Sequence, residues 1–183
     1  MDRDLVEQAR GGDREAFAIL ARAQGDRLFA IAMRILREVD LAEDAVQQAL
    51  IEAWRDLPSL RDPDRFEGWL YRTLVHNCYA EAARRRRWTS RIQVLPIDGP
   101  AAPDETLSVA DRDQLERGFR RLPAEQRAVL VMHHYLGLSS AEIATTLDIA
   151  PGTVRSRLHY AHRGMRAALE ADARPIKSTE RPA

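Results

Sequence analysis

The sequence predicts an all-α fold of two small helical domains joined by a flexible linker, with a helix-turn-helix in the C-terminal domain. Three observations support this fold class. Apolar residues recur at helical spacing, and no segment shows the sustained alternation of a strand. A stretch rich in proline and acidic residues, 96–106, interrupts the helical pattern. Two helical segments separated by a short turn then lie between Ser139 and Arg166.

Three helices are expected in the N-terminal domain, residues 1–92. Asp13 is a candidate N-cap for the first, because a carboxylate accepts backbone N–H bonds at a helix start. A loop containing two prolines is expected before the third helix. The predicted segments are a helix from Asp13 to Ile35, a helix over about 40–57, a loop over 58–65 and a helix from Phe66 to about Arg87.

The linker between the domains is placed at 93–106. Its stretch 96–106 holds three prolines, one glycine and three acidic residues, a composition that cannot bury a core. The helical pattern resumes near Leu107, so the C-terminal domain is placed at 107–170. Residues 171–183 are expected to form a disordered tail.

The first helix of the helix-turn-helix is expected to begin at Ser139 or Ser140. Either hydroxyl can accept a backbone N–H bond, and Glu142 places a negative charge in the first turn. A short turn at 148–150 follows. Pro151 then opens the second helix, where its missing N–H has no cost.

The second helix has the composition of a DNA-reading helix. Its apolar face carries Val154, Leu158 and Ala161, and residues 151–166 hold four arginines and no acid. A solvated amphipathic helix, the alternative interpretation, is expected to mix charges at i, i+4 spacing. Arginine can pair bidentately with guanine in the major groove. The residues predicted to face DNA are Thr153, Arg155, Ser156, Arg157, His159, Tyr160 and Arg163.

The formal net charge of zero hides an uneven distribution of charge. Residues 1–60 and 96–118 are acidic, whereas 61–95 and 119–174 are basic. Two basic blocks are typical of a protein that meets a polyanion at two surfaces. The first basic block also has aromatic residues in it or beside it, on which unpaired bases can stack: Trp69, Tyr71, Tyr79 and Trp88.

The composition argues against several other classes of protein. No apolar run approaches the roughly 20 residues of a membrane helix, and the charged N-terminus does not resemble a secretory signal, so the expected location is the cytoplasm. Cys78 is the only cysteine, so no intramolecular disulfide is possible. The histidines at 133, 134, 159 and 162 have no further ligand at a known metal-binding spacing. Catalytic motifs are absent from the sequence, so no enzymatic activity, metal or cofactor is expected.

Longer motifs occur in both halves. The C-terminal half contains Leu122-Pro123, Arg127, Gly137-Leu138-Ser139, Glu142-Ile143-Ala144, Leu147 and the run 152–158. The N-terminal half contains Ala42-Glu43-Asp44, Val46-Gln47, Ala53-Trp54, Phe66, Trp69-Leu70, Arg72, Asn77 and the run Arg84–Arg87. In this order and spacing, over roughly residues 5–170, they resemble the extracytoplasmic-function group of bacterial sigma factors.

This resemblance implies a dissociable subunit of bacterial RNA polymerase, with core polymerase, promoter DNA and an anti-sigma protein as partners. Residues 107–170 would be sigma region 4, which reads the minus-35 element. Residues 1–92 would be sigma region 2, which docks on the largest polymerase subunit and holds and melts the minus-10 element. The docking residues would be Asp44, Gln47, Gln48, Leu50 and Trp54. The minus-10 residues would be Arg61, Asp62, Trp69, Arg72, His76, Asn77, Arg84, Arg85, Arg86 and Arg87, with a pocket for a flipped base in the 58–65 loop.

Other interpretations of these features stay open. Trp69 is equally suited to the core, and the run Arg84–Arg87 can complement the dipole at a helix C-terminus. The sequence departs from the family pattern at Gln48-Ala49-Leu50 and over 159–162. For the whole chain, the alternative is a helix-turn-helix regulator whose N-terminal domain senses a ligand or oligomerises.

Overall fold

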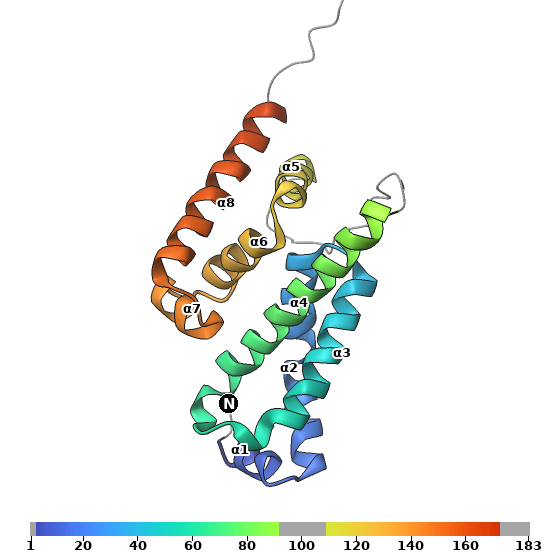
Figure 1. Cartoon of the computed structure of the whole chain (residues 1–183), viewed down its shortest axis with the longest axis vertical. Coiled ribbons are helices and arrows are strands. Elements are labelled where there is room, and N and C mark those ends of the chain that lie inside the picture. The colour runs from blue at the N-terminus through green and yellow to red at the C-terminus, as the bar shows by residue number, and fades with distance from the viewer. Residues whose placement is uncertain (1–2, 92–108, 173–183) are drawn as a thin grey trace, which may run out of the picture.

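The computed structural model describes residues 3–91 and 109–172, and these residues form helices and turns without a strand (Figure 1). The N-terminal half contains α1 (Arg3–Arg10), α2 (Arg14–Leu36), α3 (Val39–Asp56), the 3-10 turns η1 (Leu57–Ser59) and η2 (Pro63–Arg65), and α4 (Phe66–Arg91). The C-terminal half contains α5 (Val109–Arg121), α6 (Ala124–Leu130), the π-helical turn η3 (Val131–Tyr135), α7 (Ser140–Leu147) and α8 (Pro151–Asp172). The predicted all-α fold is therefore confirmed. The predicted linker 93–106 lies outside the described residues, as does the predicted tail 171–183 beyond Asp172, where α8 ends.

The start of α2 follows the predicted cap. One carboxylate oxygen of Asp13 accepts hydrogen bonds from the backbone N–H groups of Glu15 (2.8 Å) and Ala16 (3.1 Å). Helix α1 is not among the helices that the periodicity predicts. Gly12, with a φ of +98°, allows the chain to turn between α1 and α2, and Val6 anchors α1 in the core.

The helix-turn-helix begins where the sequence predicts. Ser139 is the N-cap of α7: its hydroxyl accepts from the Glu142 backbone N–H (3.2 Å), and the Glu142 carboxylate accepts from the Ser139 backbone N–H (2.8 Å). Helix α7 ends at Leu147, and its C-cap Asp148 has a left-handed φ of +54° that reverses the chain. Three residues after Asp148, Pro151 begins α8.

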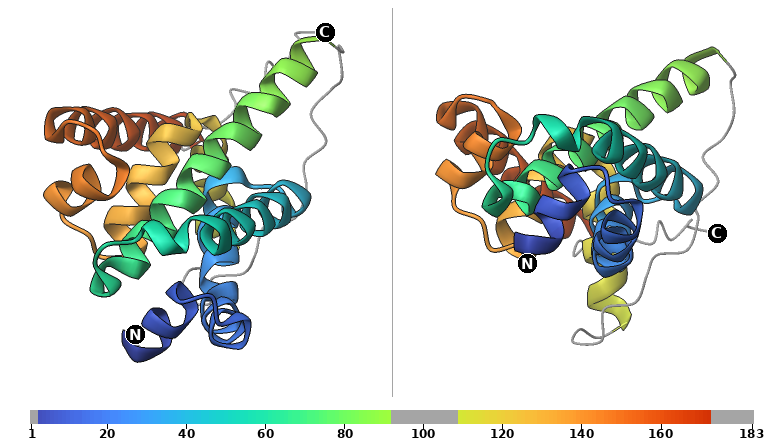
Figure 2. Two further views of the ribbon diagram at one scale, coloured as in Figure 1. Left: turned by 60° about the horizontal axis from the view of Figure 1, so that its bottom comes forward. Right: turned by 90° about the horizontal axis from the view of Figure 1, so that it is seen from below.

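The two helical halves share one continuous apolar core. Helices α2 and α4 pack against α6, and α4 also packs against α7. Figure 2 shows α4 running between α3 on one side and the C-terminal helices on the other. A continuous core has a physical reason, because each half alone is small and buries a limited share of its surface.

None of the described helices is both long and apolar enough to cross a bilayer.

Candidate nucleic-acid interface

Helix α8 presents the predicted reading face to solvent. Val154, Leu158 and Ala161 are buried against the C-terminal half, so the residues between them point outward. Among the predicted minus-35 residues, Arg155, Ser156, His159, Tyr160 and Arg163 are exposed, whereas Thr153 and Arg157 are half-buried. The amphipathic pattern read from the sequence is thus confirmed, and Arg155 and Tyr160 lie on its open side.

The π-helical turn η3 fastens α8 to the rest of the C-terminal half. His133 Nδ1 donates a hydrogen bond to the carbonyl oxygen of Leu138 (2.8 Å). A hydrogen bond also joins His134 Nε2 to His162 Nε2 of α8 (3.0 Å). His133 therefore ties η3 to the backbone that follows it, and His134 ties η3 to α8. Within residues 3–91 and 109–172, no group of three or more His, Cys, Asp or Glu side chains is placed to hold a metal ion.

Helix α4 carries most of the predicted minus-10 residues. Arg72 is half-buried and His76 is exposed. Trp69 is partly buried against the core, with its ring centroid 6.1 Å from that of Phe66. Both interpretations of Trp69 therefore keep support, because it packs on the core while part of its surface stays accessible.

Asn77 occupies a different environment from the one its predicted role requires. It is only 8% exposed. Its Nδ2 donates to Glu52 Oε2 of α3 (2.8 Å) and to the carbonyl oxygen of Thr73 (3.0 Å). Both N–H groups of the amide are thus used within the protein. Asn77 ties α4 to α3 in this structure, and a contact between Asn77 and a base stays a prediction.

The arginine run at the end of α4 has partners within the chain. Arg84 pairs with Asp44 of α3 (3.1 Å) and with Glu81 (2.6 Å). Arg85 pairs with Glu38, which precedes α3, and Arg86 lies 3.6 Å from Glu125 of α6. All four arginines are exposed. Mutual repulsion within the run is therefore offset by carboxylates, so repulsion alone does not require DNA as a partner. DNA binding by the run stays a prediction.

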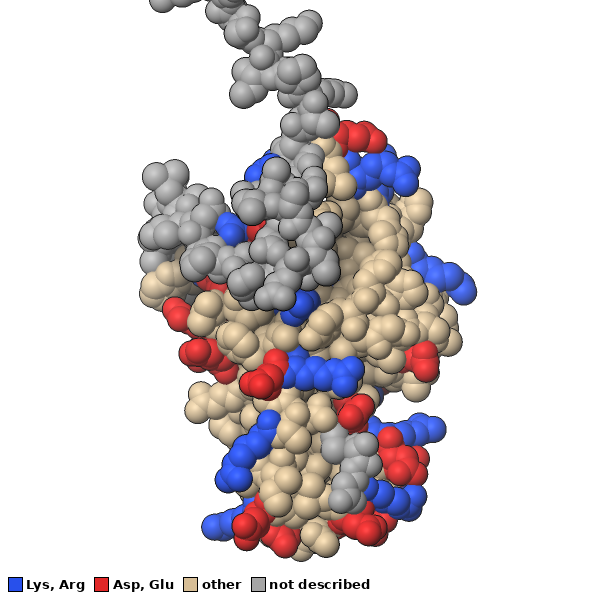
Figure 3. Space-filling view, turned by 180° about the vertical axis from the view of Figure 1, so that it is seen from behind, with Lys and Arg blue, Asp and Glu red and all other residues tan. Residues whose placement is uncertain are grey.

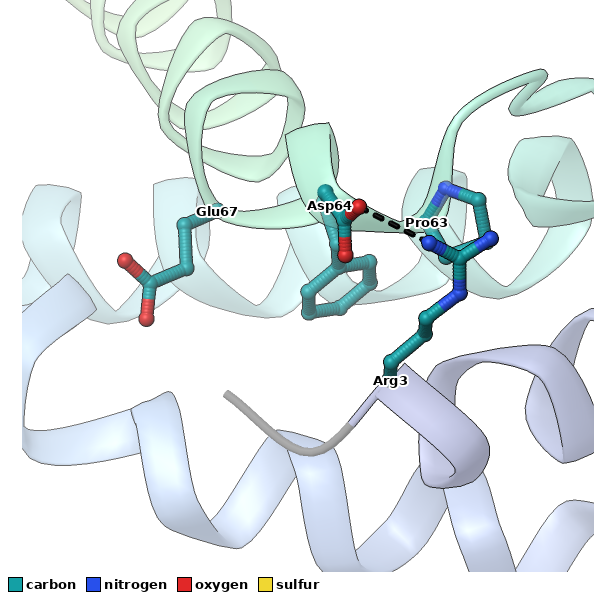
Figure 4. A pocket seen from close by; sticks show the side chains of 5 residues that line it. Arg3, Pro63, Asp64 and Glu67 are labelled. Carbon is teal, nitrogen blue, oxygen red and sulfur yellow. Dashed lines mark hydrogen bonds and ion pairs between the residues drawn. The ribbon is translucent and has the colours of Figure 1, made fainter.

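A pocket of about 180 Å³ lies between α1 and the start of α4, where Arg3 Nη1 donates to Asp64 Oδ2 at 2.9 Å (Figure 4). Pro63, Phe66 and Glu67 complete its lining. The pocket adjoins the predicted 58–65 loop.

The two loop residues chosen from the sequence do not line this pocket. Arg61 and Asp62 are exposed. The Asp62 carboxylate accepts from the Asp64 backbone N–H (3.1 Å) and so caps η2. Arg3 does line the pocket, but the sequence analysis did not predict it, because Arg3 lies 61 residues before Asp64 in the sequence.

Helix α3 presents the predicted docking residues on its outer side. Asp44, Gln47 and Gln48 are exposed, and Gln48 Nε2 donates to Glu52 Oε1 (3.0 Å). Leu50 is partly buried against the core. Trp54 is half-buried and packs on Phe17, with ring centroids 5.1 Å apart. The polar residues thus form an accessible strip, whereas Leu50 and Trp54 also support the core.

Charges of both signs are interspersed on the face shown in Figure 3, and no single-sign patch dominates it. The sequence, by contrast, has separate acidic and basic blocks along the chain. Carboxylates of one segment lie beside arginines of another, as in the pairs made by Arg84 and Arg85.

Arg127 has a role that the sequence motif does not reveal. Its Nη1 donates to the carbonyl oxygens of Leu122 (3.0 Å) and Phe119 (3.5 Å), at the end of α5. Burial lowers the pKa of Arg127 to about 10. Arg127 therefore satisfies carbonyl groups where α5 gives way to α6. A single arginine in a helical pattern carries no signal for such a role.

Comparison with known families identifies two matching segments. Residues 20–89 match the family described as Sigma-70 region 2. Residues 112–163 match the family described as Sigma-70, region 4. The first segment covers α3 and most of α2 and α4, and the second runs from within α5 through α7 into α8.

Known proteins resemble the chain over most of its length. It is 36% identical over 167 residues to the ECF RNA polymerase sigma factor SigL of Mycobacterium tuberculosis, covering 87% of this chain and 94% of that protein. It is 29% identical over 182 residues to the ECF RNA polymerase sigma factor SigW of Bacillus subtilis, covering 92% and 97%.

Two solved structures are similar in fold. The structure of CnrH in complex with the cytosolic domain of CnrY has a TM-score of 0.64 and 26% identity, covering 94% of this chain and 99% of that chain. The sigma factor RpoE in complex with the anti-sigma factor NepR from Bartonella quintana has a TM-score of 0.66 and 24% identity, covering 87% and 97%.

Proposed function

The chain belongs to the extracytoplasmic-function group of the sigma-70 family, and we propose a division of its work in transcription initiation among α3, α4 and α8. As a sigma factor it gives core RNA polymerase its promoter specificity and is not itself an enzyme. The observation that carries this function is the presence of both sigma regions, 20–89 and 112–163, in one chain. We place region 2 at residues 1–92 and region 4 at residues 107–170.

Helix α8 is the proposed reader of the minus-35 element. Its exposed face combines Arg155 with hydroxyl and imidazole groups and carries no carboxylate between Pro151 and Arg166. Such a face suits the major groove, because arginine pairs with guanine while hydroxyls reach phosphates or base edges. Arg155 and Tyr160 are the strongest candidates for base contacts, since both side chains are exposed.

The start of α4 and the loop before it are the proposed minus-10 site. The pocket combines the charged side chains of Arg3, Asp64 and Glu67 with the apolar Pro63 and Phe66. This combination suits a base that has left the stack, because a flipped base needs hydrogen bonds to its edge and an apolar surface beside its face. Arg72 would hold the adjacent phosphates.

Helix α3 is the proposed docking surface for core polymerase. The exposed strip of Asp44, Gln47 and Gln48 offers a carboxylate and two amides to a partner. Because core polymerase works in the cytoplasm, we place this chain there as well. An anti-sigma protein is the expected regulatory partner, and the relatives CnrH and RpoE were solved bound to other proteins.

Reconstitution with purified core polymerase tests this function. We expect the full chain to co-elute with core enzyme and to start transcription at defined sites on genomic DNA, where core enzyme alone does not. Mapping the start sites yields the shared minus-35 and minus-10 sequences. The proposal fails if the chain does not bind core enzyme at low salt. A regulator with a sensing domain would instead bind an operator tightly without polymerase.

A further inference from the structure

We propose that α1 sets the base specificity of the minus-10 site through its two terminal arginines. Arg10 is a positioning residue that holds the backbone of the 58–65 loop, and Arg3 supplies a guanidinium to the base at the pocket. The inference rests on the proposed function, because that function makes the loop a base-reading element. Helix α1 ends at Arg10, before residue 20, where the segment matched to Sigma-70 region 2 begins.

Helix α1 is anchored in the core with both arginines beside the loop. Val6 and Ala9 of α1 are buried, at 0% and 2% exposed. Arg3 and Arg10 are seven residues apart, which is about two helical turns, so they lie on one side of α1. That side borders the buried stripe, and α1 packs there against the turns η1 and η2. The helix therefore presents one arginine at each of its ends to the 58–65 loop.

Arg10 binds the backbone of the loop between its two turns. Its Nη1 donates to the carbonyl oxygen of Leu60 at 3.2 Å, and its side chain is half-buried. Leu60 lies between η1 and η2, where the chain is not helical, so its carbonyl takes this hydrogen bond from another element. The charge on the guanidinium strengthens the bond. Arg10 therefore fixes the point from which the loop runs on to Arg61 and Asp62.

Arg3 has a guanidinium that a base can recruit. Its Nη1 donates to Oδ2 of Asp64 at 2.9 Å (Figure 4). Its Nε donates to Oε1 of Glu7 at 3.2 Å. The side chains of Arg3 and Asp64 are 56% and 64% exposed, and an exposed ion pair contributes little stability. The guanidinium can therefore exchange Asp64 for the edge of a base at small cost, while Glu7 keeps it oriented.

The tip of the loop lies between the two contacts of α1. Arg61 and Asp62 at the tip are exposed, whereas Leu60 and Pro63 on either side of them are buried. A pocket that is already ordered loses less conformational entropy when it binds, so it can select a flipped base more sharply. Because α1 holds Leu60 and places Arg3 beside Asp64, the position of the tip relative to the pocket depends on α1.

Initiation from a promoter library tests the role of Arg10. The minus-10 element of a mapped promoter is randomised, and the transcripts made by wild-type and variant holoenzymes are counted by sequencing. Arg10→Ala should lower the preference for the favoured base at one minus-10 position by at least about 5-fold, the lower end of what one base contact supplies. Preferences in the minus-35 element should stay as in the wild type. Arg10→Lys should restore part of the preference, because an ammonium group can also donate to the Leu60 carbonyl.

The matched control for Arg10→Ala is Arg14→Ala, which removes one positive charge from an exposed position at the start of α2. It should leave every base preference unchanged. A purely structural role for Arg10 would lower initiation from all members of the library alike, and that result would overturn the proposal. So would a minus-10 preference of Arg10→Ala equal to that of the wild type. If the wild-type chain fails to initiate with core enzyme, the proposed function fails instead, and the two failures are thus distinguishable.

Arg3 provides a second test that leaves the backbone of the loop intact. Arg3→Lys keeps the charge but loses the planar fork with which arginine reads the edge of a base. We expect this variant to lose preference at the same minus-10 position as Arg10→Ala. Competition between single-stranded minus-10 oligonucleotides that differ at that position, bound to the holoenzyme, measures the loss. Its urea midpoint should equal that of the wild type, because Arg3 is exposed. A base preference unchanged by Arg3→Lys would contradict the proposal, since Arg3 would then contribute only a charge.

Discussion

At the scale of single residues, Arg155 and Arg157 of α8 differ in how much of their side chains is exposed. Arg155 is exposed, whereas Arg157 is half-buried and lies near Tyr79 of α4. Both were equal candidates by sequence, since both lie among the outward positions of one helix. In the structure Arg155 is the more exposed of the two, and it is the better single residue to test.

Arg155→Ala should weaken binding of the holoenzyme to the minus-35 element. Loss of a bidentate arginine–guanine contact costs about 1–3 kcal/mol, roughly 5- to 150-fold in affinity. Affinity for core polymerase should not change, because α8 is remote from α3. Competition between the cognate promoter and promoters altered in the minus-35 element measures the effect. Arg22→Ala, at an exposed position of α2, controls for the loss of one positive charge. An unchanged promoter preference would remove Arg155 from the reading surface.

Burial makes the thiol of Cys78 unreactive. Its side chain is fully buried, and burial raises the pKa of its thiol from 9.0 to about 12. At about pH 8 only on the order of one thiol in 10⁴ is then ionised, and the thiolate is the reactive form. We expect Ellman's reagent to react very slowly with the folded chain and fully after unfolding in urea. Rapid reaction of the folded protein would show that this part of α4 is accessible.

At the scale of elements, the capping box of α7 fixes where the helix-turn-helix begins. Ser139→Ala removes the hydroxyl that accepts the Glu142 N–H, so stability should fall by about 1 kcal/mol, within a range of about 0.5–2 kcal/mol. Urea denaturation of the full chain measures the loss. Ser140→Ala is the matched control, since Ser140 lies inside the helix and Ser139 is the cap. The assignment of the cap is wrong if both variants lose equal stability.

The contact between η3 and α8 is expected to be sensitive to pH. Burial, followed by the neighbouring His133 and His162, lowers the pKa of His134 from its ordinary value of 6.5. The unfolded chain therefore binds this proton more readily than the folded chain. Above about pH 6.5 His134 is neutral in both states, and stability is lost as the pH falls from there through the folded pKa.

Comparing urea midpoints at about pH 7.5 and about pH 5 measures this loss. His134→Asn should lose less stability than the wild type between the two pH values, because it has no proton to bind. Other groups titrate in both proteins, so the informative quantity is the difference between the two changes. An identical drop in wild type and variant would show that the His134–His162 contact carries no pH dependence.

At the scale of the whole molecule, the shared core predicts how the chain unfolds. Helices of both halves contribute to one apolar cluster, so neither half can lose its structure without exposing apolar surface of the other. We expect one calorimetric transition for the full chain, with calorimetric and van't Hoff enthalpies in agreement. Residues 1–92 prepared alone should melt at a lower temperature than the full chain. Two resolved transitions would mean that the halves are thermodynamically independent.

By itself, the sequence determined the features that depend on near neighbours along the chain. The helix that follows Asp13, the helices that begin near Asp40 and at Phe66, the cap at Ser139 or Ser140 and the outward face of 151–166 were all predicted from spacing over a few residues. Such patterns can be predicted from the sequence because helical hydrogen bonds and caps join residues at most four positions apart.

Only the tertiary structure decided which distant groups meet. Arg72 and Asp148 are 76 residues apart in the sequence, and Arg84 and Asp44 are 40 apart. The same holds for Arg3 in the pocket, for the hydrogen bond of the buried Asn77 with Glu52, and for the packing of α7 against α4. A charged or polar residue has the same local pattern whether its partner is DNA, solvent or a carboxylate from another helix. Only the packing of the helices selects among these partners.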